Sequence, residues 1–276
     1  MILDGRALAA DILARVKERA QKLPHPPRVL VIVANDTAAT KSYLAIKKAR
    51  AADAGCLLEE LHFDTHTATT EELRTAILTA NADAVVVQLP LAERMDARIV
   101  CDAIPVEKDA DVLSTVARMK FEAGEYDALI PPVAYAVAEI FAANGVDPKE
   151  KHAVVAGAGW LVGKPCATWL SHAGAGVSHI TLESGSIAML KEADIVVSGA
   201  GSPHFIKPEM LKERVVLIDA GASESNGVLA GDADPACADK CSVFTPVPGG
   251  VGPVAVACLF ENVVTLVEHT PFKHLN

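Results

Sequence analysis

A lysine, an amide and two carboxylates occur at spacings that could place them around one proton. Tyr43 and Lys47 are four residues apart in a helical pattern and should lie on one helix face. Gln88 ends an apolar run, and Asp109 and Asp111 follow a proline turn. A lysine that transfers protons needs a modulated pKa and a fixed orientation, and a neighbouring amide and carboxylate can provide both. Taken singly, a solvated Lys47, a strand-ending Gln88 and a helix-capping Asp109 are simpler interpretations.

A glycine-rich turn in the second half of the chain could bind a dinucleotide. The run HAVVAGAGWLVGKPCATWL has the pattern of strand, turn and helix, and it contains Gly157, Gly159 and Gly163. Their spacing is one residue longer than the usual dinucleotide fingerprint. With Ala158, these small residues would let a pyrophosphate reach the helix N-terminus near Lys164, where N–H groups and the helix dipole favour negative charge. A tight strand-to-helix turn without a ligand is the alternative.

Further glycines follow later strands, with Gly199 and Gly201 in SGAGSP and Gly221 in IDAGAS. Ligands of open α/β sheets bind beyond the carboxyl ends of the strands, so these loops are predicted to line the same cofactor site. Glu183 could accept hydrogen bonds from a ribose hydroxyl, which favours NAD, whereas NADP needs a basic partner for its extra phosphate. A solvated surface glutamate is an equally simple interpretation.

The stretch TPVPGGVGP, from Thr245 to Pro253, contains three prolines and three glycines. Proline fixes φ and removes a donor, while glycine permits positive φ and close approach to the backbone. An ordinary turn before the last helix needs only one or two such residues. The composition therefore predicts a shaped surface that lies against a ligand.

Alternating strand and helix patterns must position these residues. The apolar runs typical of strands buried in a parallel sheet are 28–36, 82–91, 152–159, 193–201 and 214–222. Helical patterns separate them, which predicts α/β layering with right-handed crossovers. The run NGVDPKEKH has the composition of a linker, and we place the domain boundary just before or within the helix that precedes it.

Composition narrows the classes of function. The 276 residues are 51% hydrophobic and carry a formal net charge of -10, which argues against nucleic acid as a partner. A local basic cluster, Lys41, Lys47, Lys48 and Arg50, is compatible with an anionic small molecule. The amphipathic N-terminus is too polar for a signal peptide or membrane span. Six scattered cysteines without a second pair of soft ligands predict a cytoplasmic protein with no metal site.

Longer motifs occur in an order that resembles one known family. They are LDGRALAADI, SYLAIKK, VVVQLPL, IPVEKDAD, GAGWLVGKP, ADIVVSGAG, VVLIDAG, GDAD and TPVPGGVGP. They span nearly the full length, and the last is highly specific. The chain resembles the methylenetetrahydrofolate dehydrogenase/methenyltetrahydrofolate cyclohydrolase family.

The resemblance implies a two-lobed α/β protein. An N-terminal catalytic, folate-binding domain would occupy 1–131, completed by a C-terminal helix at 254–276, and would face a Rossmann-like NAD(P)-binding domain at 132–253 across a cleft. A homodimer is usual in the family. The implied reactions are oxidation of 5,10-methylenetetrahydrofolate with NAD(P)⁺ and hydrolysis of the methenyl product to 10-formyltetrahydrofolate. These reactions belong to one-carbon metabolism and purine biosynthesis.

The resemblance also implies roles for individual residues. Lys47 matches the catalytic lysine, Gln88 the glutamine that tunes it, Tyr43 the tyrosine that packs on the folate ring, and Asp111 the aspartate that holds the pterin. The loop residues implied to contact substrate are Pro248, Gly249, Gly250, Gly252 and Pro253. Gly157, Gly159 and Gly163 match the family's cofactor loop.

Four places in the sequence depart from the family pattern. Val112 stands where glycine usually follows the aspartate, and Pro131–Ala134 replaces P-C-T-P. Ala158-Gly159 replaces a frequent Arg-Ser, which leaves NAD and NADP both open, and Val254-Ala255 replaces Met-Thr. The alternatives are a dehydrogenase-only enzyme, use of a related pterin carrier, and a non-catalytic dinucleotide-binding regulatory protein. A hydroxy-acid dehydrogenase is a weaker alternative, because no histidine and arginine pair is suitably placed.

Overall fold

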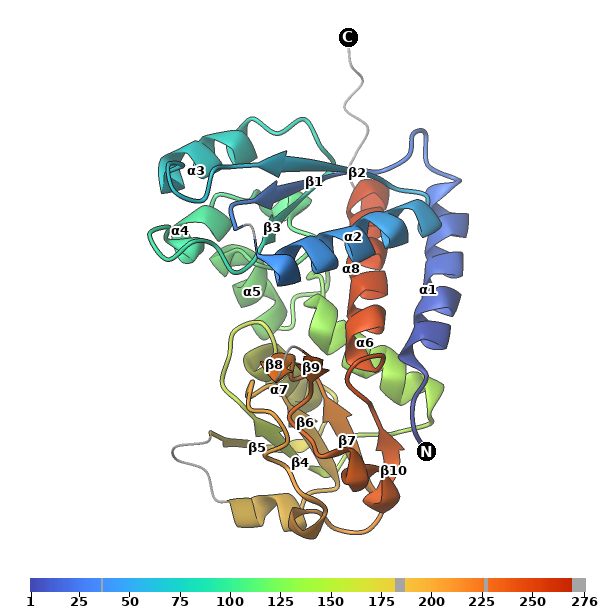
Figure 1. Ribbon diagram of the computed structural model, residues 1–276. Helices are drawn as coiled ribbons and strands as arrows, with labels where there is room; N and C mark the ends of the chain where they lie inside the picture. The colour runs from blue at the N-terminus through green and yellow to red at the C-terminus, as the bar shows by residue number, and fades with distance from the viewer. Residues whose placement is uncertain (36, 182–186, 226–227, 270–276) are drawn as a thin grey trace. The chain divides into compact units, whose positions relative to one another are not determined.

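The protein folds into two compact units, each with its own parallel sheet (Figure 1). The structure is a computed structural model that describes residues 1–35, 37–181, 187–225 and 228–269. The first unit comprises Ala10–Pro132 and Val256–Asn276, and the second comprises Met1–Ala9 and Val133–Ala255. The α/β fold class predicted from the sequence is confirmed. The domain boundaries at 131/132 and 253/254 stay a prediction.

The first unit is built on a three-stranded parallel sheet in the order β2-β1-β3. β1 (Arg28–Val33) lies between β2 (Leu57–His62) and β3 (Ala84–Gln88). Every residue of β3 is buried, which explains its unbroken apolar sequence. No residue of β2 is buried, and its sequence LLEELH was not among the predicted strands. An edge strand needs less apolar surface, so periodicity detects it poorly.

Polar caps start the helices that surround this sheet. The helices are α2 (Ala38–Asp53), α3 (Thr70–Leu78), α4 (Ala97–Cys101) and α5 (Thr115–Glu122), with most of α1 (Gly5–Ala20) and α8 (Val251–His269). Thr37, Thr69, Asp96 and Ser114 precede α2 to α5, and each side chain accepts a backbone N–H of the first turn. These contacts satisfy donors that a helix start otherwise leaves open.

Helix α8 is a core helix of the first unit over most of its length. Among the described residues it alone is long and apolar enough to cross a membrane, yet half of the apolar window is buried inside the protein. Asn262 donates from α8 to the carbonyl oxygens of Ala110 and Ile130, each at 2.9 Å. Arg19 of α1 binds Glu261 and Glu268 of α8, so the two helices lie side by side (Figure 1). Length and composition alone therefore do not distinguish this helix from a membrane span.

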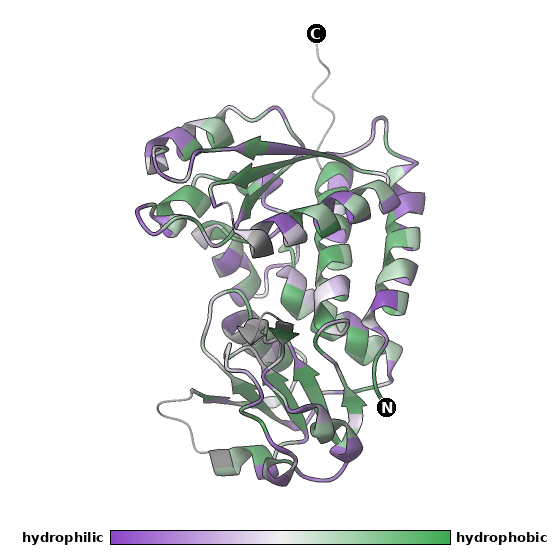
Figure 2. Ribbon diagram, viewed as in Figure 1, coloured by the Kyte–Doolittle hydropathy of each residue, from purple (hydrophilic) through white to green (hydrophobic). Residues whose placement is uncertain are grey.

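The second unit is built on a five-stranded parallel sheet in the order β10-β7-β6-β4-β5. The strands are β4 (His152–Ala156), β5 (Gly176–Ile180), β6 (Ile195–Ser198), β7 (Val215–Asp219) and β10 (Cys241–Phe244). The inner strands β4, β6 and β7 are almost wholly buried and are coloured hydrophobic in Figure 2. A parallel sheet covered on both faces requires this composition.

Helices and short turns cover this second sheet. They are α6 (Pro132–Ala143), α7 (Gly163–His172), and the 3-10 turns η2 (Ile187–Lys191), η3 (Pro208–Met210) and η4 (Pro235–Lys240). Phe141 of α6 meets Trp169 of α7 edge to face, with ring centroids 5.5 Å apart. A small antiparallel pair, β8 (Ser223–Ser225) and β9 (Val228–Ala230), follows β7. Because β4, β6 and β7 are parallel neighbours, the loops that follow them all start at the carboxyl end of the sheet.

Candidate active site

The first unit brings Lys47 and Gln88 together at the carboxyl edge of its sheet. Gln88 is the last residue of β3 and is in register with Val33, the last residue of β1. Lys47 lies on α2, the helix that follows β1 along the chain. Its Nζ donates a hydrogen bond of 2.9 Å to Oε1 of Gln88. Polar groups at this edge are where α/β proteins build their sites.

The amide of Gln88 is oriented by a second hydrogen bond. Its Nε2 donates to the carbonyl oxygen of Leu89 at 2.8 Å, which leaves Oε1 to face the lysine. The side chain of Gln88 is 6% exposed, and the peptide bond between Leu89 and Pro90 is cis. Since both ends of the amide are engaged, Gln88 restrains the direction in which the Lys47 ammonium points.

Burial and one opposite charge set the electrostatics around Lys47. Burial lowers the pKa of the Lys47 ammonium, and the negative charge of Asp111 opposes this shift. Burial also raises the pKa of the Asp111 carboxyl, and here the charge of Lys47 opposes. A lowered lysine pKa increases the fraction of neutral amine, which is the form that can accept a proton.

The buried carboxylate of Asp109 holds the backbone of the segment that carries Asp111. Asp109 is 1% exposed and accepts the backbone N–H groups of Leu113 at 2.9 Å and Ser114 at 2.8 Å. Burial raises the pKa of Asp109 to about 6, and these hydrogen bonds hold it lower than burial alone would. Val112 has a φ of 55°, a left-handed conformation that is strained for a β-branched residue. The usual glycine of the family would remove that strain.

Two other candidates of the first unit have different settings. Tyr43, one turn before Lys47 on α2, is 40% exposed, so its ring has a face open for stacking. Lys48 is exposed, and Lys108 donates to the carbonyl oxygen of Ala80 at 2.8 Å. Of these three lysines, Lys47 is therefore the one that donates to the side chain of Gln88.

The glycine turn of the second unit is shaped by close backbone contacts. Gly157 has a φ of 104°, and a Cβ there would lie 2.6 Å from the carbonyl oxygen of Gly199. A Cβ on Gly163 would collide with the carbonyl of Gly157, and one on Gly199 with the side chain of Val162. The turn thus needs glycine at these positions for its own packing, before any ligand is considered.

The remaining predicted cofactor residues lie around this turn or outside the described residues. Ala158, Gly159 and Lys164 are exposed, and within the described residues no atom beyond its chain neighbours lies within 4 Å of a Cβ placed on Gly159. Gly201 has a φ of 67° and is exposed, whereas Gly221 is buried against Asp232. Glu183 lies outside the described residues. The exposed small residues leave room for a diphosphate beside the start of α7.

The N-terminus of the chain contacts the proline-glycine loop, which is the stretch from Thr245 to Gly250 before α8. Gly5 N donates to the carbonyl oxygen of Gly249 at 3.0 Å, and a Cβ on Gly5 would collide with the carbonyl of Gly250. Gly249 has a φ of 106°. Asp4 accepts the N–H groups of the first turn of α1, which fixes the chain entering this contact. The predicted substrate residues Pro248, Gly249, Gly250, Gly252 and Pro253 belong to the second unit, and Lys47, Gln88, Asp111 and Tyr43 belong to the first.

Comparison with known proteins finds a family match for each of the two units. Residues 3–111 match the model of the tetrahydrofolate dehydrogenase/cyclohydrolase catalytic domain, and residues 131–270 match that of its NAD(P)-binding domain. The chain belongs to the tetrahydrofolate dehydrogenase/cyclohydrolase family. The bifunctional protein FolD of Aliarcobacter butzleri is 35% identical over 278 residues, covering 96% of this chain and 95% of the relative.

Solved structures of this family share the whole fold. The bifunctional FolD dehydrogenase/cyclohydrolase of Campylobacter jejuni has a TM-score of 0.93 at 30% identity and covers 97% of this chain and 98% of that one. The Trypanosoma brucei FolD, solved with NADP and an inhibitor, has a TM-score of 0.91 at 30% identity, with 97% of each chain covered. The chain is thus similar to these enzymes over nearly its full length.

Two buried aspartates of the second unit were not among the residues predicted for the family's site. Asp219 ends β7 and Asp232 lies in the GDAD motif, and both are at most 1% exposed. The signal that could have found Asp219 is the one that marked Gln88, a polar residue directly after a buried apolar run. Asp232 is not marked by any periodicity, because its partners come from distant segments of the chain.

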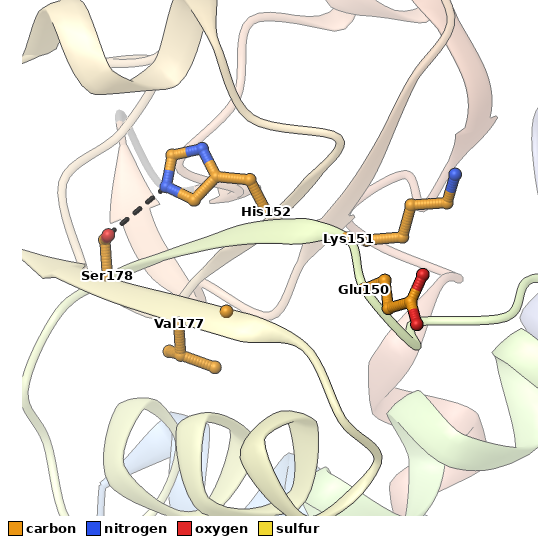
Figure 3. A pocket seen from close by; sticks show the side chains of 6 residues that line it. Glu150, Lys151, His152, Val177 and Ser178 are labelled. Atoms are coloured by element: carbon orange, nitrogen blue, oxygen red, sulfur yellow. Dashed lines mark hydrogen bonds between the residues drawn. The ribbon is translucent and has the colours of Figure 1, made fainter.

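One pocket of the second unit is not at the expected cofactor position (Figure 3). It is lined by Glu150, Lys151, His152, Gly176, Val177 and Ser178. His152 Nε2 lies 3.2 Å from Ser178 Oγ, as drawn in Figure 3. His152 and Gly176 are the first residues of β4 and β5, whereas family cofactors are expected beyond the opposite, carboxyl ends. We therefore do not assign this pocket to the dinucleotide.

Proposed function

We infer that this protein oxidises 5,10-methylenetetrahydrofolate to 5,10-methenyltetrahydrofolate with NAD(P)⁺ and hydrolyses the product to 10-formyltetrahydrofolate. The match to both domains of the family supports this inference. The observation that carries it is the hydrogen bond of 2.9 Å between Lys47 and Gln88, because it supplies the family's chemistry with an oriented amine of lowered pKa.

Lys47 is proposed as the proton-transfer group of the hydrolysis. A water molecule adds its oxygen to the methenyl carbon and gives a proton to the neutral amine. The resulting ammonium then returns that proton to the ring nitrogen as the bond between this nitrogen and the carbon breaks. The hydroxyl proton leaves to solvent as its oxygen becomes the formyl carbonyl, so one proton is released for each water consumed. A single group can serve both steps if its pKa is near the working pH, and burial moves Lys47 in that direction.

Asp111 and Tyr43 are proposed to hold the substrate. A carboxylate accepts hydrogen bonds from the N–H groups of a pterin, and the half-exposed ring of Tyr43 offers a stacking face. Further substrate contacts are proposed on the second unit, from Pro248, Gly249 and Gly250 before α8 and from Gly252 and Pro253 in its first turn. Fixed positioning of this kind contributes a large share of catalytic acceleration.

The second unit fits a dinucleotide. A Cβ on Gly157 or on Gly163 would collide with neighbouring backbone, and exposed Ala158 and Gly159 leave the helix start accessible. With Lys164, Gly199, Gly201 and Gly221, these are the residues proposed to hold NAD or NADP. When bound, the nicotinamide supplies the oxidant of the dehydrogenase step. Glu183 remains a proposed ribose contact.

The wider setting is also a proposal. The six cysteines, all described by the structure, are buried and form no disulfide, which fits a protein of the reducing cytoplasm. The formyl product is an activated one-carbon unit, so we place the reaction in one-carbon metabolism with purine biosynthesis as a consumer. A homodimer without nucleic-acid or membrane partners is the proposed assembly, in keeping with the net charge of -10.

The decisive experiment is a Lys47→Met substitution assayed for each half-reaction. We expect hydrolysis of methenyltetrahydrofolate to be abolished while NADP⁺ and NAD⁺ still bind. The control is Lys48→Met, which removes an exposed lysine from the next position of the same helix and should leave hydrolysis unchanged. Normal hydrolysis by the Lys47 variant would show that the assigned role is wrong.

A second experiment measures initial rates of the unmodified protein with NAD⁺ and with NADP⁺ through the absorbance of the methenyl product. It tests the dehydrogenase activity and the cofactor preference together. Methenyl product that accumulates without hydrolysis would identify a dehydrogenase-only enzyme.

A further inference from the structure

Asp232 accepts three hydrogen bonds from the last residue of β6 and the loop that follows it. Its Oδ2 accepts the hydroxyl of Ser198 and the N–H of Ala200, and its Oδ1 accepts the N–H of Ser202, each at 2.7 Å. The side chain is fully buried. One carboxylate thus fixes three points of a five-residue segment, and hydrogen bonds to a charged acceptor are stronger than those between neutral groups.

Asp219 holds Asp232 in place from the end of the neighbouring strand β7. Its Oδ1 accepts the N–H groups of Gly221 at 2.9 Å and Asp232 at 3.1 Å, and its Oδ2 accepts that of Ala233 at 2.8 Å. Burial raises the pKa of Asp219 to about 6, and the charge of Asp232 adds to the shift. Burying two carboxylates in one network costs free energy, and the hydrogen bonds that they accept from the two loops offset part of that cost.

The loop held by Asp232 lies directly against the glycine turn. Gly199 N donates to the carbonyl oxygen of Ala156 at 2.9 Å, just before Gly157. The close approach of Gly157 to the Gly199 carbonyl, and of Gly199 to Val162, leaves neither segment free to shift alone. The position of residues 199–202 therefore determines the shape of the turn from 157 to 163.

We propose that Asp232 is a positioning residue for the dinucleotide: its carboxylate holds the loop at 199–202, and through that loop the glycine turn, in the conformation that binds NAD(P). The proposal rests on the function proposed above. Asp232 does not contact the cofactor itself, because its side chain is fully buried and a carboxylate would repel a diphosphate. Its effect is carried by the backbone of Ala200 and Ser202.

The test is Asp232→Asn, measured by direct binding of NADPH through its fluorescence and by the KM for NADP⁺. An amide has one acceptor oxygen, so at least one of the two backbone N–H contacts is lost. We expect binding to weaken by about tenfold or more, as for loss of one hydrogen bond to a charged group. Hydrolysis of methenyltetrahydrofolate, which needs no dinucleotide, should stay within about twofold as a readout of intact folding.

Two further variants keep the proposal testable. Asp234→Asn is the matched control, because this carboxylate in the same loop caps η4 and pairs with Lys207, and its hydrogen bonds within the described residues do not reach 198–202. Ser198→Ala removes one donor from Asp232 and should weaken NADPH binding by a smaller factor, and it decides the question if Asp232→Asn does not fold.

Unchanged NADPH binding in folded Asp232→Asn would overturn the proposal, as would an equal loss of hydrolysis and binding. Failure of the proposed function has a different signature, since the unmodified protein would then turn over neither substrate, whether or not it binds NADPH.

Discussion

A carboxylate placed beside Lys47 should move the pH dependence of hydrolysis in a known direction. In the native protein Gln88 Oε1 lies 2.9 Å from Lys47 Nζ, and the glutamine is 6% exposed. Gln88→Glu replaces a neutral acceptor with a negative charge at nearly the same position. An opposite charge this close raises the pKa of a buried amine by about 1–3 units. Asp111 already acts on Lys47 in this sense, and the new charge adds to it.

The size of the effect follows from the neutral fraction of the amine. If the neutral amine accepts the proton from water, hydrolysis rises with pH up to the pKa of Lys47. Each unit of increase in that pKa lowers the neutral fraction about tenfold at a fixed pH below it. Gln88→Glu should therefore slow hydrolysis about 10- to 1,000-fold at neutral pH and move the rising part of the rate profile up by about 1–3 pH units.

The assay is the loss of methenyl absorbance against pH, with circular dichroism to confirm folding. Gln88→Met is the matched control, because it removes the hydrogen bond without adding charge. Its rate should fall from lost orientation, while its profile stays in place or moves to lower pH. A profile for Gln88→Glu that coincides with that of the unmodified protein would refute the idea that Lys47 acts as a base in its neutral form.

Two further predictions concern stability near the same site. Val112 is 3% exposed and has a φ of 55°, so Val112→Gly should be more stable than Val112→Ala by about 1 kcal/mol. Glycine avoids about 1–2 kcal/mol of left-handed strain, and its greater freedom in the unfolded chain costs about 0.5–1 kcal/mol. Urea denaturation measures this, and the ordinary order, alanine above glycine, would contradict the strained conformation. Because burial raises the pKa of Asp109 from 3.8 to about 6, the fold favours its protonated form; this contribution is present below pH of about 4 and is lost as pH rises to about 6. As pH rises from about 4 to about 6, the free energy of unfolding of Asp109→Asn should therefore increase by about 3 kcal/mol relative to that of the unmodified protein. A relative increase as pH falls would instead show that the pKa of Asp109 is lowered in the fold.

The network around Asp219 and Asp232 shows what pattern reasoning does not reach. Each of the three hydrogen bonds that the Asp232 carboxylate accepts joins residues 30 or more positions apart in the chain. Neither hydrophobic period nor turn composition encodes such a contact. The edge strand β2 was missed for a related reason, because its pairing with β1 is made by backbone groups that any sequence provides.

The sequence by itself determined the α/β class, the inner strands β1, β3, β4, β6 and β7, and the candidate lysine, amide and glycine turn, whereas it did not mark the short strand β10. These features depend on local composition: buried parallel strands need unbroken apolar runs, and tight turns need glycine. Only the tertiary structure decided that Lys47, and not Lys48 or Lys108, meets Gln88, and that Val112 takes a left-handed conformation beside Asp111. A pKa and a hydrogen bond depend on what surrounds a group in space, and those surroundings come from segments that the linear order keeps apart.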